Sequence, residues 1–232
     1  SSDLGGILMA HNTHTDFFSG FITNIALYVK PTIGCAFRMQ AAPGYICSIS
    51  DWFLCESGII GCETTISNLN YRVNFTEPGH TTPYFLRIRQ AMQFGQTLND
   101  YVDIMRRDSA GDYACTWLLG DITTGEIMLF DNGKAHNGVR RTMDGIFHAS
   151  NEAGTQEMLS KEIGKDNHGN RNSSTGARYM RMDTLLFEEH EKGELDIAAA
   201  KVIMADHDTK SNGTQLTICK HCLLVFELIF FC

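Results

Sequence analysis

Several features that would mark particular classes of protein are missing from this 232-residue sequence. The longest apolar run, residues 223–231, is interrupted by Glu227, whereas a membrane-spanning helix needs about 20 apolar residues. The formal net charge is −8, and this lack of basic surface argues against nucleic acid or an anionic membrane as a partner. There is no signal peptide and no initial Met, so we expect Ser1 to be a processed or truncated start. The composition, with 43% hydrophobic and 20% charged residues, is that of a globular protein.

Familiar catalytic and metal-binding motifs are also absent. The sequence has no G-x-S-x-G motif and no glycine-rich phosphate loop after a strand. The segment Cys219-Lys220-His221-Cys222 has no second cysteine or histidine pair to complete a zinc site, and an apolar strand follows it where a redox motif needs a helix. We therefore expect structural thiols or disulfides there, with no metal and no organic cofactor.

What the sequence does contain is eight cysteines and three N-glycosylation sequons, at Asn74, Asn172 and Asn212. The sequons fall in polar, turn-like stretches. Together with the cysteines they favour a secreted or lysosomal glycoprotein with disulfides. The alternative is that the cysteines are buried free thiols and the sequons are accidental.

The order of predicted elements indicates an α+β fold. Strands are predicted at 5–10, 21–29, 35–42, 45–50, 57–66, 112–121, 125–131 and 141–150, helices at 84–94, 97–108, 177–193 and 193–208, and an apolar strand at the C-terminus. Antiparallel hairpins in place of regular βαβ alternation suit a four-layer αββα sandwich with two mainly antiparallel sheets. We expect one domain over 1–232, incomplete at both ends, with 151–175 as a polar surface excursion.

Two polar clusters follow apolar strands. His11 and Asn12 end the first strand, and Glu63, Thr64 and Thr65 end the strand at 57–66. Each cluster alone is explained by the polarity of an edge strand. Together they could converge on one pocket that has the groups needed for acyl transfer.

Arg178 and Arg181 lie three residues apart on one predicted helix face. They could pair with surface acids such as Glu188 and Glu189, or grip a substrate carboxylate or phosphate with the guanidinium group.

The N-terminus is the remaining candidate nucleophile. A terminal Ser can use its own α-amino group, whose pKa is ordinarily about 8, as the base that accepts the hydroxyl proton. Neighbouring strands would then supply oxyanion donors and positioning groups, and His11, Asn12 and Thr64 are the candidates.

The motifs AHNTHTDF, PGYICSISDWFLCESGIIGCETTISN, RIRQAM, GDYACTWLLGD with EIMLF, GARYMR and TICKHC occur in that order over residues 5–222. In this pattern the chain resembles the phospholipase B-like proteins and, more distantly, the penicillin-acylase and acyltransferase relatives among the N-terminal-nucleophile hydrolases. The resemblance implies an αββα fold, autoproteolytic cleavage of a precursor whose N-terminal fragment could remain as a partner, and a lysosomal glycoprotein.

The same resemblance implies site residues. His11 and Asn12 match the family's strand-end pair, Thr64 a pocket hydroxyl and Arg178 a pocket arginine. Apart from the resemblance, Glu63, Thr65 and Trp117 are further substrate-binding candidates. The chain departs from the family in two places. It begins with Ser1 where the family has Cys, and it has Ala114-Cys115 where the family often has oxyanion-hole Asn residues.

The sequence thus predicts a hydrolase that cleaves an amide or ester acyl bond of a lipid or acylated small molecule, through Ser1 or a missing preceding Cys. The alternative is a catalytically inactive relative that acts as a binding or structural protein.

Overall fold

The computed structural model describes residues 6–13, 15–48, 51–67, 69–70, 82–163, 168–170, 172–192, 195–206, 210–211, 214–215 and 228–231. These residues form one sheet of seven strands, one of three and a short hairpin, together with six helices. Among them, no helix is long and apolar enough to cross a membrane.

The large sheet is an antiparallel meander in which each strand pairs with the next one along the chain. Strands β6 and β7 are buried over nearly their whole length, so they form the most buried part of the sheet. They are joined by the tight turn predicted at 122–125. The strands are β2 (Ile25–Val29), β3 (Phe37–Ala41), β4 (Trp52–Cys55), β5 (Ile59–Thr65), β6 (Cys115–Asp121), β7 (Glu126–Asn132) and β8 (Asn137–Thr142).

Two helices, α2 (Tyr84–Phe94) and α3 (Leu98–Arg106), cover one face of this sheet. The predicted cap of α3 is present as a capping box: the Asp100 amide donates to the Thr97 hydroxyl at 3.2 Å, and the Thr97 amide donates to the Asp100 carboxylate at 2.9 Å. Both helices start where the sequence places them.

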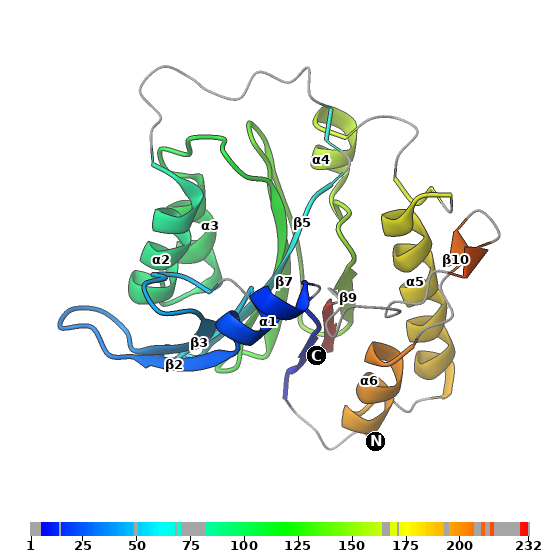
Figure 1. The fold of residues 1–232 in the computed structure, drawn as a ribbon, viewed down its shortest axis with the longest axis horizontal. Coiled ribbons are helices and arrows are strands. Elements are labelled where there is room, and N and C mark those ends of the chain that lie inside the picture. The colour runs from blue at the N-terminus through cyan, green and yellow to red at the C-terminus, as the bar shows by residue number, and fades with distance from the viewer. Residues whose placement is uncertain are drawn as a thin grey trace.

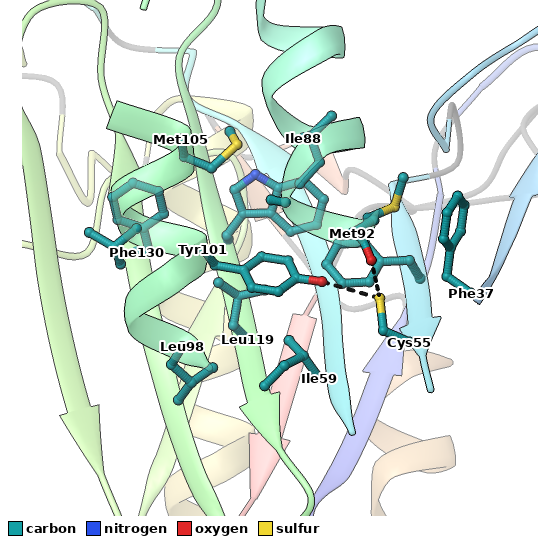
Figure 2. Close-up of a cluster of buried hydrophobic side chains, with 14 of the residues drawn as sticks. Phe37, Cys55, Ile59, Ile88, Met92, Leu98, Tyr101, Met105, Leu119 and Phe130 are labelled. Carbon is teal, nitrogen blue, oxygen red and sulfur yellow. Dashed lines mark hydrogen bonds between the residues drawn. The ribbon is translucent and has the colours of Figure 1, made fainter. Parts of the chain in front are cut away.

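The main hydrophobic core lies between these helices and the sheet, as Figure 2 shows. Phe53 and Tyr101 stack in it with ring centroids 5.6 Å apart, and the Cys55 thiol lies 3.1 Å from the Tyr101 hydroxyl. Full burial of side chains of this size stabilises a fold by about 1.5–3 kcal/mol each, which makes this layer the anchor of the large sheet.

The small sheet packs on the other face of the large sheet. It consists of β1 (Leu8–His11), β12 (Leu228–Phe231) and β9 (Ile146–Ala149), with β12 in the middle and both pairings antiparallel. Side chains of β9 meet those of β5 to β7 in a second core, whose buried members are Cys62, Leu118, Ile127, Leu129, Phe147 and Ala149.

Helices α5 (Ser174–Lys192) and α6 (Ile197–Met204) form the outer layer over the small sheet. Their apolar residues, including Met182 and Ile203, pack against Leu8, Ala10 and Ile146. Figure 1 shows the resulting order of helices, sheet, sheet and helices. The predicted α+β fold, with its two antiparallel sheets between helices, is confirmed.

The early elements differ from the predicted ones in two places. Residues predicted as one strand at 21–29 divide between α1 (Phe17–Thr23) and β2, because Asp16 caps α1 by accepting from the Ser19 amide at 2.9 Å. The strand predicted at 45–50 lies later, as β4. Its start follows a turn at Pro43-Gly44, where Gly44 has a positive φ of 87°.

The later elements also differ. Strand β8 has too few apolar residues to be recognised from periodicity. Part of the surface excursion predicted at 151–175 is instead packed: α4 (Gln156–Lys161) buries Met158 beside Ala153 and Ile163. The remaining elements are β10 (Lys210–Ser211) and β11 (Thr214–Gln215), which pair as a hairpin.

Candidate functional site

Thr64 lies near the end of β5 and faces the small sheet, because its neighbours Cys62 and Leu118 on that face pack against β9. Its hydroxyl is fully buried and accepts a hydrogen bond of 3.2 Å from the Asn151 amide. The structure therefore places this predicted hydroxyl where the two sheets meet.

Asn151 connects Thr64 to the outer helix layer. Its side-chain amide donates to the Thr65 carbonyl at 2.8 Å, and its amide oxygen accepts from Arg178 of α5 at 2.8 Å. Its backbone is left-handed, with φ of 60°, a conformation that Asn tolerates better than most residues. Sequence reasoning missed this residue, since nothing local distinguishes an Asn directly after a strand.

The predicted pocket residue Arg178 is thus joined through Asn151 to Thr64, whereas its neighbour Arg181 has a different role. Arg181 forms two hydrogen bonds to the Asp206 carboxylate, at 3.0 and 2.6 Å, which fasten α5 to the segment after α6. Of the two arginines, Arg178 is the one placed beside the strand ends.

His11 ends β1 and reaches β5 from the small sheet. Its imidazole hydrogen-bonds to the backbone of Glu63, next to Thr64, and burial lowers the imidazole pKa from 6.5 to about 4. The ring is therefore neutral at pH 5 and above, and a neutral imidazole can both donate and accept a hydrogen bond. The two predicted strand ends do converge at this point.

Asn12 is directed elsewhere. Its side-chain amide donates to the Met204 carbonyl at 2.8 Å, at the C-terminal end of α6. That bond satisfies one of the helix's last carbonyls and ties β1 to the outer layer.

Glu63, Thr65 and Trp117 lie on the opposite face of the large sheet from Thr64. Adjacent residues of a strand point to opposite faces, and Glu63 is directly opposite Trp117 on β6. Trp117 packs in the main core, with its ring 5.3 Å from that of Phe53. These three predicted substrate-binding residues therefore lie in the layer below α2 and α3, apart from His11 and Thr64.

A buried carboxylate, Asp131, holds the turn that follows Asn151. It accepts hydrogen bonds from the Thr116 hydroxyl at 2.7 Å, from the Gly154 amide at 3.0 Å, and from the Thr155 amide and hydroxyl, both at 2.7 Å. Burial raises the Asp131 pKa, and these donors oppose the rise. Asp131 thereby fixes the turn at 154–155 to β6 and β7 of the large sheet.

Several other predicted groups lie outside the described residues, namely Ser1, Asn74, Asn212 and the Cys219–Cys222 segment. Asn172 is described: it is exposed, in the turn before α5. No group of three or more His, Cys, Asp or Glu side chains in the described ranges could hold a metal ion.

The cysteines that the structure describes form no disulfide, contrary to the expectation of a disulfide-bonded protein for that part of the chain. Cys55 and Cys62 are buried thiols, and burial raises the pKa of Cys55 to about 12. A thiol with so high a pKa is not reactive as a nucleophile near neutral pH. The five free cysteines are Cys35, Cys47, Cys55, Cys62 and Cys115.

Comparisons with known proteins give a similarity of structure alone. No protein-family model matches the chain, and no curated protein sequence matches it. Among solved structures, two crystal structures of variants of the conjugated bile acid hydrolase from Clostridium perfringens are similar, each with a TM-score of 0.47 and 11% identity. The aligned regions cover 85% and 86% of this chain and 69% of each hydrolase chain. At that degree of similarity no residue role is transferred from them.

Proposed function

We propose that this chain is an acyl hydrolase of the N-terminal-nucleophile class that cleaves an amide or ester bond of a lipid or acylated small molecule, as phospholipase B-like proteins do. The observation that carries the proposal is the convergence of His11, Thr64, Asn151 and Arg178 between the two sheets and α5. These residues supply an imidazole, a hydroxyl, an amide and a guanidinium, which suit acyl transfer.

In this proposal the Ser1 hydroxyl is the nucleophile and its own α-amino group is the base. The oxygen attacks the acyl carbonyl carbon, the amino group takes the hydroxyl proton and passes it to the departing amine or alcohol, and an acyl-ester of Ser1 forms. Water then attacks that ester, releases the carboxylic acid and restores the free hydroxyl.

Asn151 and Arg178 serve the substrate in this proposal. One N–H of the Asn151 amide is occupied by the Thr65 carbonyl, and we assign the second to the oxyanion that develops during attack. Arg178, which donates to Asn151, fixes the orientation of that amide and attracts a carboxylate or phosphate of the substrate. Arg178 thus links substrate binding to the oxyanion donor.

We also propose a lysosomal or secreted location, with the cleaved N-terminal fragment of the precursor as a partner chain and with glycans on the sequons. The exposed position of Asn172 is compatible with an attached glycan.

N-terminal sequencing and intact-mass measurement of the mature protein are the first test. A free Ser1 supports the serine mechanism, and a Cys directly before Ser1 replaces it with a thiol mechanism. A ragged or blocked N-terminus would show that the mature protein has no processed N-terminal nucleophile.

The second test uses a fatty-acyl amide of a fluorescent amine and phosphatidylcholine as substrates. Ser1→Ala should abolish turnover of whichever is cleaved, and an acylating inhibitor should add its mass at residue 1. Binding of fatty acid with no turnover and no adduct would identify the inactive relative instead.

A further inference from the structure

A buried hydrogen-bond network lies under β5, on the face opposite Thr64. The Tyr113 hydroxyl donates to Glu63 Oε1 at 2.7 Å and also hydrogen-bonds to the Thr65 hydroxyl. The Glu63 amide donates to the Asp51 carbonyl at 2.8 Å. Glu63 is only 1% exposed, so this end of β5 is held by bonds that water does not reach.

The second carboxylate oxygen, Glu63 Oε2, is completely buried and lies within hydrogen-bonding geometry of no donor in the described part of the chain. The Asp51 carboxyl and the Cys115 thiol both hydrogen-bond to the Glu63 side chain. Two carboxylates cannot hydrogen-bond unless one carries a proton, because each accepts and neither donates. The contact therefore requires one proton between the two acids.

The groups around the two acids bring no positive charge, within the described part of the chain. They are Cys62 and Thr65 of β5, Cys115 of β6, Tyr113 before β6, Tyr84 of α2 and Cys47 before β4. The nearest arginines have other partners. The Arg87 guanidinium lies 3.7 Å from the Asp112 carboxylate, and the charge of Arg89 interacts with the Cys47 thiol. Without a cation, two negative charges in contact repel each other in a buried site, so the shared proton is retained.

The same short stretch of β5 also makes hydrogen bonds on its other face, which is turned toward the small sheet. His11 hydrogen-bonds to the Glu63 backbone, and the Thr64 hydroxyl accepts from Asn151. The position of this backbone is thus fixed from below by Glu63, Asp51 and Tyr113. On the opposite face, this same backbone determines where His11 and Thr64 lie.

We propose that Glu63, Asp51 and Tyr113 are positioning residues, in which one proton shared by the two acids fixes the part of β5 that carries Thr64 and contacts His11. The link to catalysis rests on the proposed function, whereas the positioning itself can be measured without turnover. Because burial raises the pKa of Glu63 to about 7 and that of Asp51 well above its ordinary range, the pair carries two protons below about pH 7 and the one shared proton above it. Protonation of Glu63 at lower pH removes the charged acceptor of this network and displaces this part of β5.

The test follows the His11 ring signals by NMR while the pH is raised, with His11→Gln used to assign them. His11 itself titrates at about 4, whereas burial raises the pKa of Glu63 to about 7, so the two events are separated. We expect a second inflection of the His11 signals near pH 7. Glu63→Gln should remove it, because the Gln amide does not titrate. Asp51→Asn should keep it, because Glu63 stays buried and the Asn amide donates to it as the protonated Asp51 does.

Tyr113→Phe provides an independent variant that keeps the core filled. The Tyr113 hydrogen bond lowers the Glu63 pKa, so its removal should move the inflection to higher pH. Glu56→Gln is the matched control, because Glu56 is an exposed acid that accepts from the Tyr28 hydroxyl at 2.6 Å. It should leave the inflection unchanged.

Stability gives the second measurement. The Glu63 pKa is higher in the folded protein than its ordinary 4.5, so the unfolding equilibrium constant should rise by up to about tenfold per pH unit between about 4.5 and 7, relative to Glu63→Gln. If this dependence appears while the His11 signals show no inflection near pH 7, the acids are only structural and the positioning proposal is overturned. Failure of the substrates above leaves both measurements intact, so the two proposals can fail separately.

Discussion

Arg178 donates a hydrogen bond of 2.8 Å to the amide oxygen of Asn151, although the two residues belong to different layers of the fold. Through Asn151 the guanidinium on α5 is joined to the end of β5, where Thr64 lies. One residue therefore links α5 directly to the end of β5.

Two substitutions of Asn151 should separate what its side-chain hydrogen bonds contribute to the free energy of unfolding from what its left-handed backbone contributes. Asn151→Gly keeps the left-handed conformation and loses the two side-chain hydrogen bonds, which should lower the free energy of unfolding by ~1–3 kcal/mol. Asn151→Ala should lose about 1 kcal/mol more, because a Cβ is disfavoured at φ of 60°. Urea unfolding measures both, and equal stability of the two variants would show that the backbone stores no strain.

The His11 ring should stay uncharged far into the acid range. Its folded pKa of about 4 lies below the ordinary 6.5, so folding stability is lost as the pH falls from about 6.5 to 4. The first inflection of the ring-proton shifts should have a midpoint near pH 4. A midpoint above pH 6 would mean that the imidazole is not buried against β5.

Asp131→Asn should be one of the more damaging isosteric changes in the chain. The new NH₂ group faces donors where the carboxylate accepted four hydrogen bonds, so we expect a loss of about 2–3 kcal/mol in free energy of unfolding. Asp144→Asn, at an exposed position, is the control and should change stability by less than about 0.5 kcal/mol. Chemical denaturation that ranks the two variants equally would contradict this role for Asp131.

Gly61→Ala should disturb the packing of β5 in the main core. A Cβ there would lie 2.6 Å from the Phe53 ring and 2.7 Å from a Leu119 methyl, so both side chains must move. Overpacking of this kind costs about 1–3 kcal/mol. Gly6→Ala meets no atom within 4 Å and should leave the thermal midpoint almost unchanged, which a melting curve of both variants would verify.

Local chemistry made much of the fold predictable. The α3 cap needed only Thr97 and Asp100, three residues apart, and the β6–β7 hairpin followed from two apolar strands around a short turn. Strand β8 was missed because it is a largely exposed edge strand, paired with β7 through its backbone, and its polar sequence, NGVRRT, contains only one apolar side chain.

The candidate site was predictable only in part. His11 and Thr64 were found because strand ends attract polar residues, but Asn151 reaches Thr64 across 87 positions, a distance that no local pattern encodes. Strand alternation alone could have separated Glu63 and Thr65 from Thr64, since neighbours on a strand face opposite ways. Which of the two faces meets the small sheet depends on packing between distant segments.

The pairing of β1 with β12 has a consequence for how the site comes into being. The large sheet joins neighbours along the chain and can close its hairpins early, whereas His11 pairs with Leu228, so the small sheet must close a loop that spans nearly all the described chain. During synthesis the ribosome makes β12 after every other described element. Competence for the proposed chemistry is therefore acquired only once β12 has been made and has paired with β1.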